Sequence, residues 1–289
     1  MARYGLFLGC TVPARLVAYD LSTRRVFEAL GVELIDLRGV GCCGSPDMAS
    51  VSKEAALAVA AWNLALAEEQ GVDTLVTLCN GCNEVLSRAV EELKDEELRS
   101  TVNAVLKETG HEYKGGVIVK HIVRVLYEDV GVERVRGAVK KPLKGLKVAV
   151  HYGCHLLRPS EVLKFDDPDN PRSLDELVEA TGATSIPYMD KLECCGLPVL
   201  AVREELAYAI ARDKIRAARE AGADVLVTVC PFCYLHLENT QVLGEVPEEE
   251  QVPVLHYPQL LGLAMGMEPD DVGLYENKLD ASKVLDVLG

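Results

Sequence analysis

The strings CCGSP (residues 42–46) and CNGC (79–82) occur a second time in the chain, as CCGLP (194–198) and CPFC (230–233). One more cysteine precedes each copy, so all ten cysteines of the 289 residues fall into two five-cysteine sets. The sets are Cys10, Cys42, Cys43, Cys79 and Cys82, and Cys154, Cys194, Cys195, Cys230 and Cys233. Matching cysteines lie 144 to 152 residues apart. This regularity indicates a tandem repeat of one fold.

The sequence around the cysteines also repeats and predicts the fold class. EEQGVDTLVTLCNGC (68–82) matches REAGADVLVTVCPFC (219–233). In each copy, short β-branched runs alternate with longer segments that have apolar residues at helical spacing. Those helical segments are 14–30, 53–70, 173–181 and 204–220. Such alternation predicts a parallel sheet with right-handed crossovers. We therefore expect an α/β protein of two Rossmann-like αβα lobes, residues 1–140 and 141–289, related by a pseudo-twofold axis.

Composition excludes several functional classes. The net charge of −15 argues against nucleic-acid binding, which needs a basic surface to neutralise phosphates. No run approaches the roughly 18 apolar residues of a membrane-spanning helix. The apolar run in MARYGLFLGC (1–10) is too short for a secretory signal, so we expect a cytoplasmic protein. Thiols stay reduced in that compartment, and this favours metal binding over a disulfide framework.

The cysteines follow the predicted strands and point to metal centres. Cys10, Cys79, Cys154 and Cys230 come at the ends of predicted strands, where parallel sheets place their ligands. Thiolates are soft ligands for zinc and for iron–sulfur clusters. A zinc ion or a cubane 4Fe–4S cluster uses four ligands, whereas each set supplies five. The fifth thiolate could bridge irons in an unusual cluster, act as a reactive thiol or stay idle.

The loop with the cysteine pair is predicted to approach an inorganic core. Gly44 and Gly196 follow the two pairs and permit a positive φ, so the backbone can come close to a ligand. Adjacent side chains diverge and reach two atoms of an extended cluster more readily than one ion. Glycines 39, 41 and 44 also match G-x-G-x-x-G, but the second copy lacks this pattern. We therefore reject dinucleotide binding.

The doubled pattern of Cys, CCG and CxxC resembles the cysteine-rich CCG domain, and nearly the whole chain resembles the B subunit of heterodisulfide reductase. The resemblance implies an oxidoreductase subunit of methanogenesis with two non-cubane 4Fe–4S clusters, each held by one five-cysteine set. Its substrate would be the disulfide of coenzyme M and coenzyme B, reduced to two thiols. Its partners would be the ferredoxin-like C subunit and the flavin-containing A subunit of that reductase, with hydrogenase or formate dehydrogenase as the source of electrons.

Six further residues are singled out, four for roles around the sites and two for structural roles. His155 follows Cys154, where the first copy has Thr11, and we expect this imidazole to protonate a product thiolate. A structural hydrogen bond is the alternative role. Arginines near the cysteine loops are candidates for the anionic tails of the substrate. These candidates are Arg15, Arg158 and Arg203. His121 and His256 occupy equivalent positions in both copies, so we expect them to be structural.

Two rival functions remain open from the sequence. The chain could be a CCG-domain subunit of a related enzyme, such as a thiol:fumarate reductase or a 2-hydroxy-acid oxidase. It could also be a zinc-stabilised scaffold without redox activity. Metal analysis separates the scaffold from the enzymes, because clusters require iron and acid-labile sulfide.

Overall fold

A computed structural model of the protein describes residues 3–244 and 246–288. The first sheet has four parallel strands in the order β2-β1-β3-β4, and the second has four parallel strands in the order β6-β5-β7-β8. The strands are β1 Arg3–Phe7, β2 Glu33–Asp36, β3 Thr74–Thr77 and β4 Ile118–His121, and β5 Lys147–His151, β6 Thr184–Ile186, β7 Val225–Thr228 and β8 Val254–His256. The α/β class and the two similar parallel-sheet lobes are confirmed.

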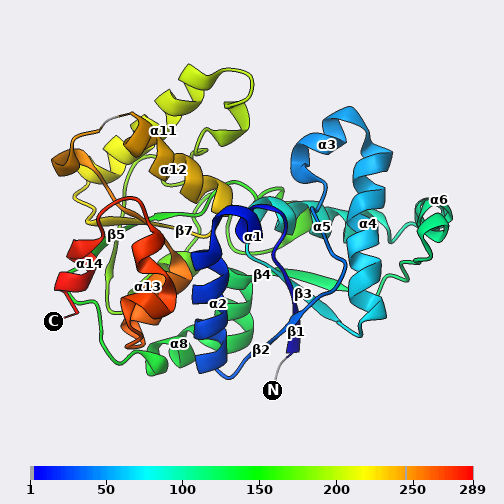
Figure 1. The fold of residues 1–289 in the computed structure, drawn as a ribbon, viewed down its shortest axis with the longest axis horizontal. Helices are drawn as coiled ribbons and strands as arrows, with labels where there is room; N and C mark the ends of the chain where they lie inside the picture. Colours follow the sequence, from blue (N-terminus) through cyan, green and yellow to red (C-terminus); the bar gives the residue numbers. More distant parts are fainter. Residues whose placement is uncertain (1–2, 245, 289) are drawn as a thin grey trace.

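Helices follow the strands as the crossovers require (Figure 1). The first lobe contains α1 Thr11–Arg15, α2 Val17–Ala29, α3 Ser45–Val51, α4 Lys53–Glu69, α5 Asn80–Glu92, α6 Glu96–Leu106, η1 Lys107–Thr109, α7 Ile122–Arg124, the π-helical η2 Val125–Gly131 and α8 Val132–Ala138. The second contains α9 Ser160–Leu163, α10 Ser173–Ala180, η3 Leu197–Val199, α11 Glu204–Glu220, α12 Pro231–Leu243, η4 Glu248–Glu250, α13 Tyr257–Ala264, η5 Pro269–Val272, η6 Leu274–Glu276 and α14 Ser282–Asp286. Within the described residues, no helix combines the length and apolar character needed to cross a membrane.

Each lobe contributes a helix to the other. Helix α13, which follows the last strand of the second sheet, packs against α2 of the first lobe (Figure 1). Reciprocally, α8 and η2 follow β4 and pack against α10 of the second lobe. One continuous cluster of buried apolar side chains runs through both lobes. The lobes therefore hold each other in a fixed relation, and we keep residue 140, in the segment joining α8 to β5, as a proposed boundary.

The predicted helix over 14–30 is interrupted at Leu16. This residue has φ −136° and ψ 60°, which separates α1 from α2. The interruption changes the direction of the chain, so that α1 contacts α12 of the second lobe while α2 packs on α13. The helices predicted over 53–70, 173–181 and 204–220 are confirmed as α4, α10 and α11.

Candidate metal centres

The first five cysteines converge at the carboxyl end of the first sheet, and we call them the first nest. Cys10 and Cys79 lie just past β1 and β3, Cys42 and Cys43 precede α3, and Cys82 lies in the first turn of α5. All five line one hollow, together with Pro231 and Phe232 of the second lobe. Cys10 and Cys42 are exposed, and the other three are buried. The first nest therefore opens to the surface.

The second nest repeats this arrangement with less exposure. Cys154 and Cys230 lie just past β5 and β7, Cys194 and Cys195 precede η3, and Cys233 lies in the first turn of α12. Cys154 and Cys194 are half-buried, and the other three are buried. All ten described cysteines are free thiols, so the structure gives no support to a disulfide framework.

Contacts between thiols join the five members of each nest. In the first nest, hydrogen bonding from Cys82 lowers the pKa of Cys43 to about 7, and Cys42 contacts both Cys43 and Cys10. The same bond raises the pKa of Cys82, so Cys43 is the member of this pair that ionises first. Cys79 completes this nest through its contact with Cys82.

The second nest has the same sequence of contacts. Hydrogen bonding from Cys154 is the largest cause that lowers the pKa of Cys194 far below that of a free thiol. Cys194 contacts Cys195, Cys195 contacts Cys233, and Cys233 contacts Cys230. Each lobe thus gathers five thiols that contact one another.

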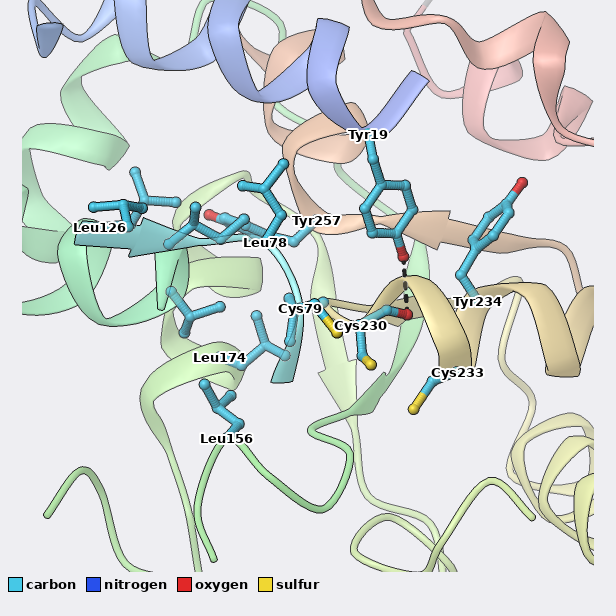
Figure 2. Packing of buried hydrophobic residues seen from close by; sticks show 14 of the residues in the cluster. Tyr19, Leu78, Cys79, Leu126, Leu156, Leu174, Cys230, Cys233, Tyr234 and Tyr257 are labelled. Carbon is cyan, nitrogen blue, oxygen red and sulfur yellow. Dashed lines mark hydrogen bonds between the residues drawn. The ribbon is translucent and has the colours of Figure 1, made fainter. Parts of the chain in front are cut away.

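The two nests meet at the first cysteine of each CxxC string. The thiols of Cys79 and Cys230 contact each other, and their sulfur atoms lie side by side in Figure 2. The hydroxyl of Tyr19, from α2, donates to the backbone oxygen of Cys230 at 3.2 Å (Figure 2). Asn80, next to Cys79, donates from Nδ2 to the backbone oxygen of Tyr152 at 2.7 Å. The relative position of the nests is therefore fixed by buried hydrogen bonds between the lobes.

Glycines shape both loops around the sulfur atoms. Gly44 and Gly196 have φ of 105° and 96°, which confirms the positive φ expected after each cysteine pair. The strand-end glycines Gly9 and Gly153 also have positive φ, of 66° and 72°. A Cβ on Gly153 would lie 2.5 Å from Nδ2 of Asn80. Gly9 and Gly153 were not predicted as functional residues, although a Gly-Cys pair follows the first predicted strand of both copies and indicates them.

A histidine that sequence reasoning missed lies in the second nest. His151, the last residue of β5, is fully buried, and its ring and the thiols of Cys195 and Cys233 offer ligand atoms within 4.8 Å of one another. Burial lowers the pKa of His151 to about 3, so the ring is neutral at physiological pH. The signal was its position three residues before Cys154, where the first copy has Phe7.

The predicted proton donor and the three arginines predicted for the substrate lie on segments that follow cysteines in the sequence, but none of the arginines lines the hollow of the first nest. His155 is half-buried, with Nδ1 3.3 Å from the backbone oxygen of Arg158. Arg158 itself donates to the backbone oxygen of Pro168 at 2.7 Å and lies 3.7 Å from Asp169. Arg15 lines a hollow with Tyr19 and Tyr234, and Arg203 is exposed just before α11. Their roles stay predictions.

The two equivalent histidines are built into the fold. His121 is buried, with Nε2 3.1 Å from the backbone oxygen of Val229 and Nδ1 accepting from the Val123 N–H. Burial lowers its pKa to about 4. His256 is also buried and stacks on Tyr19, with ring centroids 3.5 Å apart. These contacts agree with the structural role expected for both.

The donor set fits an iron–sulfur core better than a single ion. Five sulfur donors meet in each nest, three of them buried in apolar surroundings, and the loops carry no bulky side chain where Gly44 and Gly196 approach. Zinc would leave one thiol of five unused in each lobe. A cubane 4Fe–4S cluster would also leave one thiol unused, so the fifth thiol is accommodated only if the core differs from a cube.

Two curated relatives match the sequence along nearly their whole length. The cysteine-rich domain family matches residues 4–87 and 148–238. The chain is 41% identical over 285 residues to the B subunit of the ferredoxin/F(420)H(2)-dependent CoB-CoM heterodisulfide reductase of Methanosarcina acetivorans, covering 96% of this chain and 94% of that protein. It is 36% identical over 285 residues to the 8-methylmenaquinol:fumarate reductase membrane anchor subunit of Wolinella succinogenes, covering 97% and 98%.

A third relative and one solved structure agree with this placement. A protein of Archaeoglobus profundus, described as like the B subunit of heterodisulfide reductase, is 40% identical over 280 residues, covering 94% of this chain and 93% of that protein. A crystal structure of a hypothetical protein from Helicobacter pylori has the same fold, with a TM-score of 0.76, at 20% identity. The match covers 95% of this chain and about half, 51%, of that one. The chain therefore belongs to the cysteine-rich CCG domain family, as an iron–sulfur reductase subunit related to the B subunit of heterodisulfide reductase.

Proposed function

We propose that this chain reduces the coenzyme M–coenzyme B heterodisulfide to two thiols, with one non-cubane 4Fe–4S cluster in each nest. The observation that carries the proposal is that five thiols contact one another in each lobe. The name of the Methanosarcina relative supplies the substrate class. When bound, two such clusters would supply one electron each, which matches the two electrons needed to convert one disulfide to two thiols.

The chain's own residues would bind the disulfide where the nests meet. The hollow of the first nest is open at Cys10 and Cys42 and is closed on one side by Pro231 and Phe232 of the second lobe. A disulfide entering it would lie near Cys79, which contacts Cys230 of the second nest. Both centres are thus within reach of one bound molecule.

Protonation and charge recognition fall to side chains on the surrounding loops. Asn83 holds the backbone of His155 through a hydrogen bond of 3.2 Å from Nδ2 to the carbonyl oxygen. If Nδ1 of His155 donates to the Arg158 carbonyl, Nε2 is the atom that would carry a proton to a product thiolate. We propose Arg15, Arg158 and Arg203 as partners for the anionic tails of the substrate.

The electrons must come from other subunits. The described residues include no further cysteine set outside the two nests, and the relatives are named as subunits of larger reductases. We propose a ferredoxin-like C subunit and a flavin-containing A subunit as partners in the cytoplasm, with hydrogenase or formate dehydrogenase as the ultimate donor.

A second function is favoured by one observation. The Wolinella relative is named as part of a fumarate reductase and matches over 98% of its own length. The chain could therefore pass electrons between a partner and a fumarate-reducing subunit. Disulfide reduction by the isolated chain with a chemical reductant would favour the first function, whereas electron transfer without disulfide reduction would favour the second.

The test is anaerobic spectroscopy of the purified protein with and without the heterodisulfide. We expect about eight irons per chain with equivalent acid-labile sulfide, and a paramagnetic signal that appears when the disulfide is added to the oxidised or partly reduced protein. Two zinc ions without iron would instead establish the scaffold, and iron without any response to the disulfide would reject the substrate.

A further inference from the structure

The two nests hold the same thiols in different electrostatic surroundings. Phe7 ends β1 and pairs with Thr77, whereas His151 ends β5 and pairs with Thr228. Thr77 and Thr228 are repeat equivalents, so Phe7 and His151 occupy the same position in the two lobes. An apolar ring in the first nest is thus replaced by an imidazole in the second.

His151 has hydrogen-bonding capacity that the described protein atoms do not use. The side chain is completely buried, and neither ring nitrogen makes a hydrogen bond of good geometry among the described residues, although the Lys191 backbone lies close enough to act on the ring. The ring lies within 4.8 Å of the Cys195 and Cys233 thiols. A buried imidazole N–H normally has a partner, because an unpaired polar group in the interior is destabilising. A cluster sulfur at this site would be that partner.

A buried cation accompanies His151. Lys214, in α11, is 1% exposed and donates to the backbone oxygen of Asp190. Its ammonium lies 5.6 Å from the ring of Tyr188. Burial lowers the pKa of Lys214, while the thiols of Cys233 and Cys195 favour its charged form. Asp190 and Glu193 also face it, but they are half-buried and exposed, so water screens them more.

The first lobe has a neutral residue in the place of Lys214. Asn63 of α4 is the repeat equivalent, and it is also fully buried. Its side chain donates to the Cys42 backbone oxygen at 3.0 Å and accepts from the Gly41 N–H at 2.9 Å. Asn63 and Lys214 both hold backbone close to the cysteine pair, but only Lys214 has a side chain that can carry a positive charge.

A backbone donor adds to the asymmetry where the nests meet. The N–H of Asn80 donates to the sulfur of Cys230. The reciprocal donor to Cys79 is missing, because the residue equivalent to Asn80 is Pro231, which has no N–H. The second nest therefore receives one hydrogen bond more from the opposite lobe.

These differences act on the reduction potential of a bound cluster. Added positive charge and hydrogen bonds to sulfur stabilise the reduced, more negative state and raise the potential. The greater exposure of the first nest raises the potential of a cluster there instead, since water also stabilises the reduced state. The charge of Lys214 has the larger effect on the potential, because Lys214 is enclosed with the thiols in a buried site where screening is weak.

We propose that the second nest holds its electron more tightly than the first, and that Lys214 and His151 are positioning residues that set this difference. The inference rests on the proposed function, because it requires a cluster in each nest. The electron donated first by a reduced iron–sulfur partner would then reside in the second lobe.

The test is a redox titration, with dithionite and ferricyanide, of the reconstituted protein followed by absorbance and paramagnetic resonance. Lys214→Asn and His151→Phe install the residues of the first lobe. We expect wild type to show two one-electron transitions and each variant to lower the upper one. The expected change is about tenfold or more in the ratio of oxidised to reduced cluster, or about 59 mV for a one-electron centre.

Matched controls separate charge at the nest from general damage. Lys214→Arg keeps the charge, and Arg216→Asn removes a positive charge from the same helix at a side chain that is 58% exposed. Both should leave the two transitions in place. The inference is overturned if the variants at 214 and 151 move the lower transition or neither one. Iron and sulfide are measured in the same samples, so wild type lacking both would instead reject the proposed function.

Discussion

The two nests contain the same five ligands but lie in different environments. The thiols follow the same strands and loops in both lobes, yet two are exposed in the first nest and none in the second. Phe7 and Asn63 surround the first, whereas His151 and Lys214 surround the second. The donor atoms and the backbone that presents them are therefore the same in both copies, whereas the neighbouring side chains have diverged. Binding a core and tuning it are therefore separable in this chain.

Removing one ligand from one nest is expected to have the largest effect. We expect Cys82→Ser to abolish the first centre and Cys233→Ser the second, because serine is a poor replacement for a thiolate ligand. Each variant should retain about four irons of about eight. Iron and sulfide analysis after anaerobic reconstitution measures this. A loss of all iron in either variant would show that the nests bind their metal as one unit.

The next largest effect concerns the glycine after each cysteine pair. Alanine is strained at the positive φ of both residues, which costs about 1–2 kcal/mol. At Gly44 the new Cβ would have no atom closer than 3.6 Å, whereas at Gly196 it would lie 2.5 Å from the backbone oxygen of Ala207. That oxygen also accepts from His236 at 3.1 Å and cannot easily shift. We expect Gly196→Ala to lower the free energy of unfolding by more than about 3 kcal/mol.

Urea unfolding followed by circular dichroism checks this pair, with the cysteines kept reduced. Gly44→Ala is the matched control, since it carries the strain of a positive φ without the overlap. Equal losses of stability in the two variants would mean that the loops relax equally well, contrary to the close approach seen in the second lobe.

A buried carboxylate lies beneath the second nest, and the first nest has no counterpart to its tyrosine. Asp175 accepts from Tyr152 at 2.7 Å and from Ser185 at 2.6 Å, and pairs with Lys191 at 2.6 Å. The first lobe has Leu8 where the second has Tyr152. Breaking a buried pair costs about 3–5 kcal/mol. The Lys191 side chain is 21% exposed, so we expect about 2 kcal/mol from Lys191→Met.

Chemical unfolding of Lys191→Met against wild type measures this effect. Lys94→Met is the control, because Lys94 forms an ion pair with Glu91 on the surface, with side chains 63% and 42% exposed. It should change stability by less than about 1 kcal/mol. If both lysines behave alike, the network under the second nest contributes nothing beyond a surface pair.

Much of this architecture could be predicted from the sequence. The runs before Cys79 and Cys230 are apolar and β-branched, and they form the buried strands β3 and β7. The cysteines at the strand ends come together because parallel strands end at one edge of a sheet. The break at Leu16 and the packing of α13 against the first lobe were not predicted, because both depend on contacts between segments far apart in the chain. His151 reads locally as one residue of a strand.

Aligning the two copies would have exposed the asymmetry. Phe7 opposite His151 and Asn63 opposite Lys214 are visible in the sequence alone. The sequence does not show which of these side chains are buried. A lysine in an amphipathic helix normally lies on the solvated face, and only the packed structure shows that Lys214 is 1% exposed.

The smallest predicted effect lies at the junction of the nests. Asn80 donates from Nδ2 to the Tyr152 oxygen at 2.7 Å, and its own Oδ1 has no partner among the described residues. Asn80→Ala leaves a buried carbonyl unpaired but also removes an unsatisfied acceptor, so we expect a net loss of about 1 kcal/mol. Asn83→Ala, which removes a longer and less buried bond to His155, should cost less.

Gly153 turns this modest effect into a test of contact between the lobes. Alanine at 153 would place its Cβ 2.5 Å from Asn80 Nδ2, so Gly153→Ala alone combines overlap with the strain of φ 72°. In the double variant with Asn80→Ala the overlap is absent and the strain remains. We therefore expect the double variant to lose less stability than the sum of the single variants, by about 0.5–3 kcal/mol in a double-mutant cycle. Strict additivity would mean that the lobes do not touch at this point.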